Sequence, residues 1–224
     1  MSTASPRRKS AQVEAEMRLV LQPAVKYLLA LPPGYAAKRN KRWPLLVFLH
    51  GSGERGESPE ILRKFGPAAR VEQGKKFPFI LLTPLCPRYE WWSTDVIEGL
   101  IADISRRYRV DADRIYLTGL SMGGFGVWAL AAKHPERYAA ILPICGEGEW
   151  SWAKRLATLP VWAFHGELDP VVPVARTREM IAALREAGGR PKLTIYKKLY
   201  HDSWTKTYAN DAVYAWMLKQ RRSV

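Results

Sequence analysis

The stretch TGLSMGGFG, residues 118–126, surrounds one serine with four glycines directly after an apolar, strand-like segment. Ser121 lies at the centre of a G-x-S-x-G sequence that a helix-like segment follows. A tight strand-to-helix turn strains the backbone of such a serine and brings segments so close that β-carbons at Gly119 and Gly123 would clash. The N–H groups that begin the following helix favour negative charge beside the hydroxyl. The stretch therefore predicts an exposed serine nucleophile.

A serine nucleophile needs a general base, and the chain contains four histidines. We expect His134 to lie at the surface or cap the helix after the serine. His50 and His165 each close a strand just before a glycine, and we expect both to shape loops. His201, in KLYHDSW, comes after the last expected strand and after the candidate acid. We therefore assign His201 as the general base.

The orienting carboxylate is expected in the segment HGELDPVVP. Asp169 lies there in the loop after the penultimate expected strand, and Glu167 lies two residues earlier. Asp202 adjoins His201, but neighbouring side chains usually point apart, so we interpret Asp202 as a hydrogen-bonding residue of its loop. The order Ser121, Asp169, His201 is the serine, acid, histidine order of one hydrolase architecture. We therefore assign Asp169 as the acid.

The tetrahedral intermediate of acyl transfer also needs two N–H donors for its oxyanion. One is expected from Met122, the residue after the nucleophile. The other is expected from HGSGERG after the first parallel strand, from the N–H of Ser52, with Gly53 as the alternative.

These residues require a scaffold of alternating strands and helices. Helical spacing of apolar residues, with cap or stop signals, predicts helices within 93–110, 173–189 and 203–220. Two N-terminal strands, VEAEMRLVLQ and VKYLLALPPGY, are expected to form an antiparallel hairpin. After these two strands, the alternation of expected strands and helices predicts an α/β fold with a mostly parallel twisted sheet and helices on both faces. Its buried strands are expected in six short apolar runs: WPLLVFLHG, FPFILLTP, RIYLTG, AAILPICG, PVWAFHG and KLTIYKKL.

The composition indicates one globular domain, since the 224 residues are 47% hydrophobic and 25% charged. We expect a frayed tail over 1–10 and a single domain over 11–224. A membrane span needs about 18 consecutive apolar residues, and no window approaches this, nor does the start resemble a secretion signal. A cytoplasmic protein is therefore expected. Cys86 and Cys145 follow separate expected strands, so we expect free thiols.

The net charge of +14 is the one extreme value of the composition. Lysine and arginine occur in small scattered groups rather than in one block, which favours a solvated basic surface over nucleic-acid binding.

The chain resembles the α/β-hydrolase superfamily in LLVFLHGSGERG, RIYLTGLSMGGFGVWALAAKHPERYAAILPICG, VWAFHGELDPVVP and YHDSW. Within it, these segments are similar to the small serine esterase and predicted peptidase group related to feruloyl esterases, polyhydroxybutyrate depolymerases and dienelactone hydrolases. The resemblance covers residues 15–220. It implies that Ser121 forms an acyl-enzyme, that Asp169 and His201 complete the triad, and that neither a metal nor an organic cofactor is used. Dienelactone hydrolases carry cysteine at the nucleophile position, so Ser121 argues against that activity.

The segment EGEWSWAKRLATLP, after the fourth of the six runs, leaves room for one short helix, so we expect an open site without a large cap domain. Aromatic residues also gather in loops at the carboxyl ends of the strands, where Tyr89 and Trp152 lie. Five of these aromatic residues are expected to wall a substrate pocket: Trp91, Trp92, Phe125, Trp150 and Trp204.

The residues together predict a serine carboxylesterase that acts on small-molecule esters with short-chain or aromatic groups. A serine peptidase or acyl-aminoacyl hydrolase with the same triad is one alternative. A basic binding protein on an inactive hydrolase scaffold is another, from a different functional class.

Overall fold

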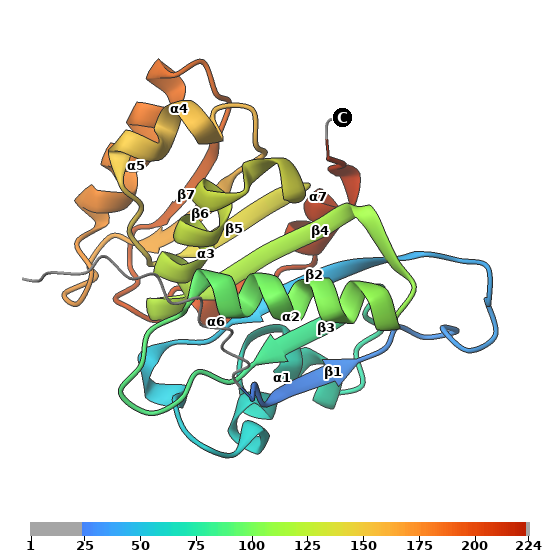
Figure 1. Cartoon of the computed structure of the whole chain (residues 1–224). Coiled ribbons are helices and arrows are strands. Elements are labelled where there is room, and N and C mark those ends of the chain that lie inside the picture. The colour runs from blue at the N-terminus through green and yellow to red at the C-terminus, as the bar shows by residue number, and fades with distance from the viewer. Residues whose placement is uncertain (1–23, 223–224) are drawn as a thin grey trace, which may run out of the picture.

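A computed structural model describes residues 24–222 of the chain (Figure 1). The tail expected over 1–10 and the strand expected over 13–22 lie outside the described residues. No helix among the described residues is long and apolar enough to cross a lipid bilayer. Cys86 and Cys145 are both buried and free, as expected.

One sheet holds seven strands in the order β1-β3-β2-β4-β5-β6-β7 (Figure 1). The first strand pairs antiparallel with β3, and every other pairing is parallel. All six apolar runs form strands, so the mostly parallel sheet is confirmed. The strands are β1 (Tyr27–Ala30), β2 (Trp43–Leu49), β3 (Ile80–Pro84), β4 (Val110–Leu120), β5 (Ala140–Ile144), β6 (Trp162–Gly166) and β7 (Lys192–Tyr196).

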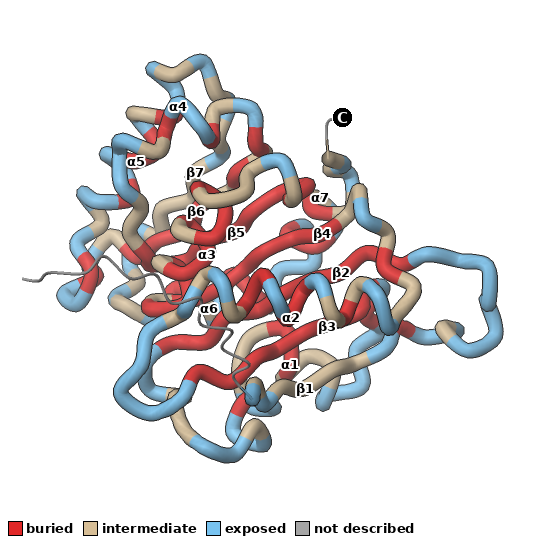
Figure 2. Tube along the Cα trace, viewed as in Figure 1, coloured by how far each residue is buried: buried red, intermediate tan, exposed pale blue. Residues whose placement is uncertain are grey.

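Helices cover both faces of the sheet. The described helices are α1 (Gly66–Glu72), α2 (Thr94–Arg107), α3 (Met122–Lys133), α4 (Ala153–Leu156), α5 (Val174–Glu186), α6 (Trp204–Ala209) and α7 (Asp211–Lys219). Apolar side chains of α2, α3, α4 and α5 join one core cluster, and those of α1, α6 and α7 join a second. Strand β2 contributes to both in alternation, with Leu45 and Val47 in the first and Leu46 and Phe48 in the second. The central strands are therefore buried on both faces (Figure 2).

The expectation of a buried strand is wrong for β7. Lys192 is exposed and the other four residues of β7 are only partly buried. Strand β7 pairs with β6 alone and forms one edge of the sheet, so solvent reaches its free flank.

The expected helix over 203–220 is instead two helices, α6 and α7. Asn210 lies between them in an extended conformation, with ψ 111°, and its side chain accepts a hydrogen bond from the N–H of Ala212. Asparagine competes in this way for backbone N–H groups and begins a new helix instead of continuing the old one. The helix expected over 93–110 begins as predicted, with Ser93 as the cap of α2.

Candidate active site

Ser121 lies in the sharp turn between β4 and α3, with φ 51° and ψ −119°. A positive φ is strained for any residue except glycine, so the surrounding packing must hold the turn. That packing leaves no space for β-carbons. A β-carbon on Gly119 would lie 2.4 Å from the carbonyl oxygen of Gly123, and one on Gly123 would lie 2.0 Å from that of Leu49. A β-carbon at either glycine would therefore clash with the backbone, as expected.

We expect Gly123→Ala to destabilise the protein by about 3 kcal/mol or more, because backbone atoms of β2 and α3 would have to separate. Urea denaturation followed by circular dichroism measures the change. Gly99→Ala on α2 is the matched control, because a β-carbon there meets nothing within 4 Å. That variant should be as stable as the parent or more stable, and equal stability of the two variants would contradict the clash.

His201 joins Ser121 to Asp169. His201 Nε2 lies 2.9 Å from Ser121 Oγ, and His201 Nδ1 lies 2.7 Å from Asp169 Oδ2. The three residues follow the carboxyl ends of β4, β6 and β7, which meet at one edge of the sheet. If Nδ1–H donates to the carboxylate, Nε2 is free to accept the hydroxyl proton of the serine.

Asp169 is buried, and several described neighbours donate hydrogen bonds to its carboxylate. Oδ1 accepts from the N–H groups of Val171 and Val172, at 2.8 and 3.0 Å, and Oδ2 accepts from His201. Burial alone would raise the pKa of Asp169, but these hydrogen bonds outweigh it and hold the pKa below its ordinary value. The carboxylate is therefore ionised at neutral pH.

The other candidate acids and His134 have separate roles. Glu167 forms an ion pair with Arg178 at the surface, and Asp202 accepts from the N–H and hydroxyl of Thr205. His134 ends α3, as expected.

His165 has a contact that the sequence analysis missed. It is fully buried, and its Nε2 lies 3.1 Å from Asp169 Oδ2 and 2.9 Å from the carbonyl oxygen of Val172. Burial lowers its pKa, so the ring is neutral, and Nε2, which faces two acceptors, carries the proton. One oxygen of Asp169 thus accepts from two imidazoles, those of His165 and His201. The only sequence signal was the spacing of four residues between His165 and Asp169.

His50 anchors the loop after β2. Its Nδ1 lies 2.6 Å from the carbonyl oxygen of Gly51 and therefore donates, while its Nε2 accepts from the N–H of Cys86 at 3.0 Å. This pattern requires the neutral ring, and burial lowers the pKa of His50 to about 4. The imidazole therefore ties the loop that carries Ser52 to the segment after β3.

We expect this arrangement to make the fold acid-sensitive. A histidine that titrates near 6.5 in the unfolded chain and at about 4 in the folded one destabilises the fold as pH falls between these values. The full loss is on the order of 3 kcal/mol. Melting temperature measured from pH 7.5 to 4 should fall more steeply in the parent than in His50→Gln. Parallel curves would contradict this role of His50.

The two expected oxyanion donors lie after the neighbouring strands β2 and β4. Met122 is the first residue of α3, and Ser52 begins a 3₁₀ turn, Ser52–Glu54, after β2. Strand β2 pairs with β4 up to Leu49 and Gly119, so the ends of the two strands lie side by side. Within the described residues, the N–H groups of Ser52 and Met122 have no backbone or side-chain acceptor. Neither N–H group is therefore committed to a described acceptor.

An aromatic cavity of about 300 Å³ adjoins the first turns of α3. Phe125 in that helix donates its N–H to the carbonyl oxygen of Ser121 at 3.1 Å, so the cavity begins one helical turn from the nucleophile. The residues that line it are Trp91, Trp92, Phe125, Gly126, Ala129, Glu147, Glu149 and Trp152.

Three of the five expected pocket residues line this cavity, and two do not. Trp150 is 72% exposed and lies outside, while Trp152 takes its place. Both belong to one 3₁₀ turn, Trp150–Trp152, in which residues two apart point in different directions. Trp204 is the first residue of α6 and packs edge-on against the imidazole ring of His201, with ring centroids 5.3 Å apart. Tyr89, also in these loops, is almost fully exposed.

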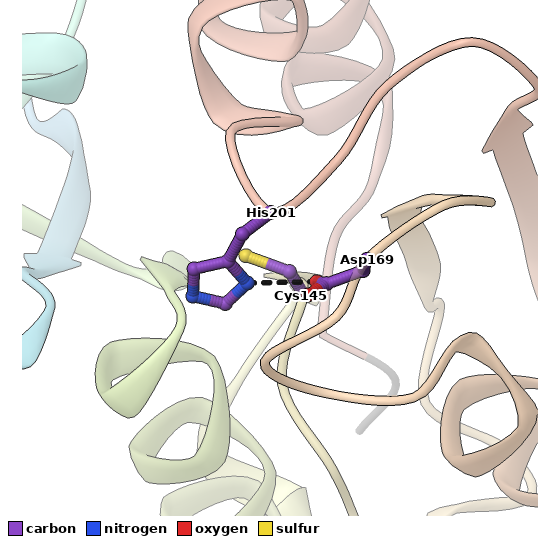
Figure 3. A group of neighbouring side chains, drawn as sticks. All are labelled: Cys145, Asp169 and His201. Carbon is purple, nitrogen blue, oxygen red and sulfur yellow. Dashed lines mark hydrogen bonds and ion pairs between the residues drawn. The ribbon is translucent and has the colours of Figure 1, made fainter.

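Cys145 lies beside the acid and the base (Figure 3). The possible ligand atoms of Cys145, Asp169 and His201 all lie within 4.8 Å of one another, a spacing that a metal ion could use. Burial raises the pKa of the Cys145 thiol to about 12, whereas a metal ligand must be a thiolate. His201 Nδ1 is also already bonded to Asp169. The group fits hydrogen-bond chemistry better than metal binding.

Comparison with known proteins identifies relatives across most of the chain. The model of the phospholipase/carboxylesterase family matches residues 93–211. NocK of Nocardia uniformis subsp. tsuyamanensis is 29% identical over 164 residues, which cover 66% of this chain and 46% of NocK. A solved thermostable esterase superimposes with a TM-score of 0.77 at 34% identity, over 88% of this chain and 60% of that one. A solved ferulic acid esterase, with a TM-score of 0.67 and 20% identity over 85% and 89% of the two chains, shares the fold.

Proposed function

The chain belongs to the phospholipase/carboxylesterase family, and from this membership we propose that it is a serine carboxylesterase acting on short-chain or aromatic esters. The observation that carries the proposal is the hydrogen-bonded series from Ser121 Oγ through His201 to Asp169, with distances of 2.9 and 2.7 Å. The strained backbone of Ser121 and the ionised carboxylate of Asp169, both beside His201 at one edge of the sheet, support this proposal. Acyl transfer needs these three groups in this order.

In the first half of the reaction, Ser121 Oγ attacks the ester carbonyl carbon as its proton passes to His201 Nε2. The carbonyl oxygen becomes an oxyanion, which accepts hydrogen bonds from the N–H groups of Ser52 and Met122. Each such donor typically stabilises the transition state by about 3 kcal/mol. Asp169 stabilises the imidazolium and keeps its orientation. The intermediate then expels the alcohol, which takes the proton from Nε2, and the acyl group stays on Ser121.

In the second half, water replaces the alcohol. His201 Nε2 takes a proton from the water as its oxygen attacks the acyl carbon, and returns the proton to Ser121 Oγ as the acid leaves. The reaction therefore needs His201 neutral at the start of each half.

The substrate class follows from the space beside Ser121. Only the short turn Trp150–Trp152 and the one-turn helix α4 separate β5 from β6, so this connection forms no large cap. The cavity of about 300 Å³ is walled by aromatic rings, among them Trp91 and Phe125, whose centroids lie 6.0 Å apart. A cavity of this volume suits a small aromatic or short aliphatic group better than a long acyl chain.

Hydrolysis of p-nitrophenyl esters from acetate to palmitate tests the proposal, with a fluorophosphonate as active-site titrant. We expect stoichiometric labelling of Ser121 and a maximum of kcat/KM at short chains. Matched p-nitroanilides test the peptidase alternative, and we expect much slower turnover of the amides. A chain that is neither labelled nor active on any ester would contradict the proposal.

A further inference from the structure

The aromatic cavity differs in charge from the rest of the molecule. The chain carries a net charge of +14, yet the charged side chains that line the cavity are two carboxylates, Glu147 and Glu149. Arg176 of α5 approaches Glu147, with its Nε 3.5 Å from Oε1, and shares its charge with Glu179. No ion pair joins Glu149 to another described residue. The cavity is therefore an acidic site on a basic protein.

Aromatic rings form most of the remaining wall, together with Gly126 and Ala129 of α3. Trp91 stands edge-on to Phe125 at an interplanar angle of 82°. Trp92 packs on α3 at Gly126, where a β-carbon would lie 2.9 Å from its Cδ1, and its N–H already donates to the carbonyl oxygen of His50. Trp152 completes the set. The face of an aromatic ring carries partial negative charge and attracts cations.

The polar groups of the cavity also favour one type of ligand. Ionised carboxylates only accept hydrogen bonds, so Glu147 and Glu149 repel a second carboxylate. A polyol can donate its hydroxyl hydrogens to them, but it brings no positive charge for the carboxylates or the ring faces to attract. An alkylammonium group offers positive charge and apolar methyl groups, and it satisfies both the rings and the carboxylates.

We propose that this cavity binds the cationic group of the substrate, an alkylammonium carried by the alcohol or the acyl half of the ester. The inference rests on the proposed esterase activity, because the cavity begins one helical turn from Ser121 and would hold a group attached to the ester under attack. Specificity would then come from charge and from ring faces, with Glu149 as the anion that no described residue pairs.

Two pairs of esters test this with shape held constant, since a quaternary nitrogen and a quaternary carbon have nearly equal size. Acetylcholine is compared with 3,3-dimethylbutyl acetate for the alcohol half. Methyl 4-(trimethylammonio)butanoate is compared with methyl 5,5-dimethylhexanoate for the acyl half. We expect kcat/KM of the cationic ester to exceed that of its neutral partner by about tenfold in at least one pair, mostly through KM.

Glu149→Gln should reduce this ratio by about threefold or more at low salt, because it removes the charge and keeps the shape. Trp152→Leu should also reduce it through the lost ring face. Glu186→Gln, at the far end of α5 from Arg176, makes the same change of net charge away from the cavity and should leave the ratio unchanged.

A ratio of one or less in both pairs, with p-nitrophenyl acetate still hydrolysed, would overturn the cation site and leave the esterase proposal standing. Loss of all ester turnover would instead contradict the esterase proposal. In that case calorimetry with choline, compared with its neutral isostere 3,3-dimethylbutan-1-ol, tests the cavity by itself. Preferential binding of the cation that weakens in Glu149→Gln would support the site, and equal or absent binding would overturn it.

Discussion

Ser121→Ala should lower kcat for p-nitrophenyl acetate by about 10⁴ to 10⁶ while the protein stays folded. The substitution removes the oxygen that lies 2.9 Å from His201 Nε2 and leaves the His201–Asp169 pair intact. Alanine still has a β-carbon, so the strained φ of 51° is neither relieved nor worsened. The free energy of unfolding should therefore change little, and fluorophosphonate labelling should disappear.

Ser121→Gly separates catalysis from strain at the same position. Glycine adopts a positive φ without steric cost, so this variant should lose the same activity but gain about 1 kcal/mol of stability in urea denaturation. Ser105→Ala in α2 removes a serine hydroxyl away from the site and should retain full activity. Retention of more than a few per cent of the activity in either Ser121 variant would show that another residue is the nucleophile.

The sheet could be predicted from the sequence because its strands are buried on both faces. Such strands are continuous apolar runs, and each of the six runs became a strand of the sheet. The partial exposure of β7 could not be predicted from its own residues. It arises because β7 lies at the edge of the sheet, and the order of the strands cannot be read from one strand's sequence.

The three residues Ser121, Asp169 and His201 could be placed together because carboxyl ends of parallel strands meet at one edge. Their hydrogen-bonding partners could not be predicted in this way. The contact of His165 with Asp169 depends on the direction in which a buried ring points. The positions of Trp150 and Trp152 depend on the single 3₁₀ turn that both residues belong to. The side-chain torsions of His165 in β6 and the rotation of the turn Trp150–Trp152 decide these contacts, and hydrophobic periodicity carries no information about either.

Asp169→Asn is the second substitution for which we expect a large effect, a loss of kcat of about 10⁴. The backbone fixes the amide that would replace the carboxylate. The N–H groups of Val171 and Val172 both point at Oδ1, so the oxygen of the amide must take that place and its NH₂ group must take the place of Oδ2. The NH₂ group then faces His201 Nδ1.

A donor facing Nδ1 reverses the roles of the two ring nitrogens. Nδ1 must accept, the proton moves to Nε2, and His201 can no longer take the proton of Ser121. Binding of substrate depends on other residues, so the loss should lie in kcat with KM nearly unchanged. Asp202→Asn is the matched control, because its carboxylate bonds only Thr205 among the described residues, and its kcat should change by no more than a few fold.

The stability of the same variant should depend on pH with a defined sign. The pKa of Asp169 is depressed in the folded protein, so its ionisation stabilises the fold above the ordinary aspartate pKa of about 4, and this contribution disappears as pH falls through the lower folded value. Asp169→Asn lacks the contribution at every pH. It should therefore melt below the parent at pH 7, and the gap between the two melting temperatures should shrink as the pH drops below about 4. A gap that stays constant with pH would mean that the hydrogen bonds from Val171, Val172 and His201 do not favour the ionised acid.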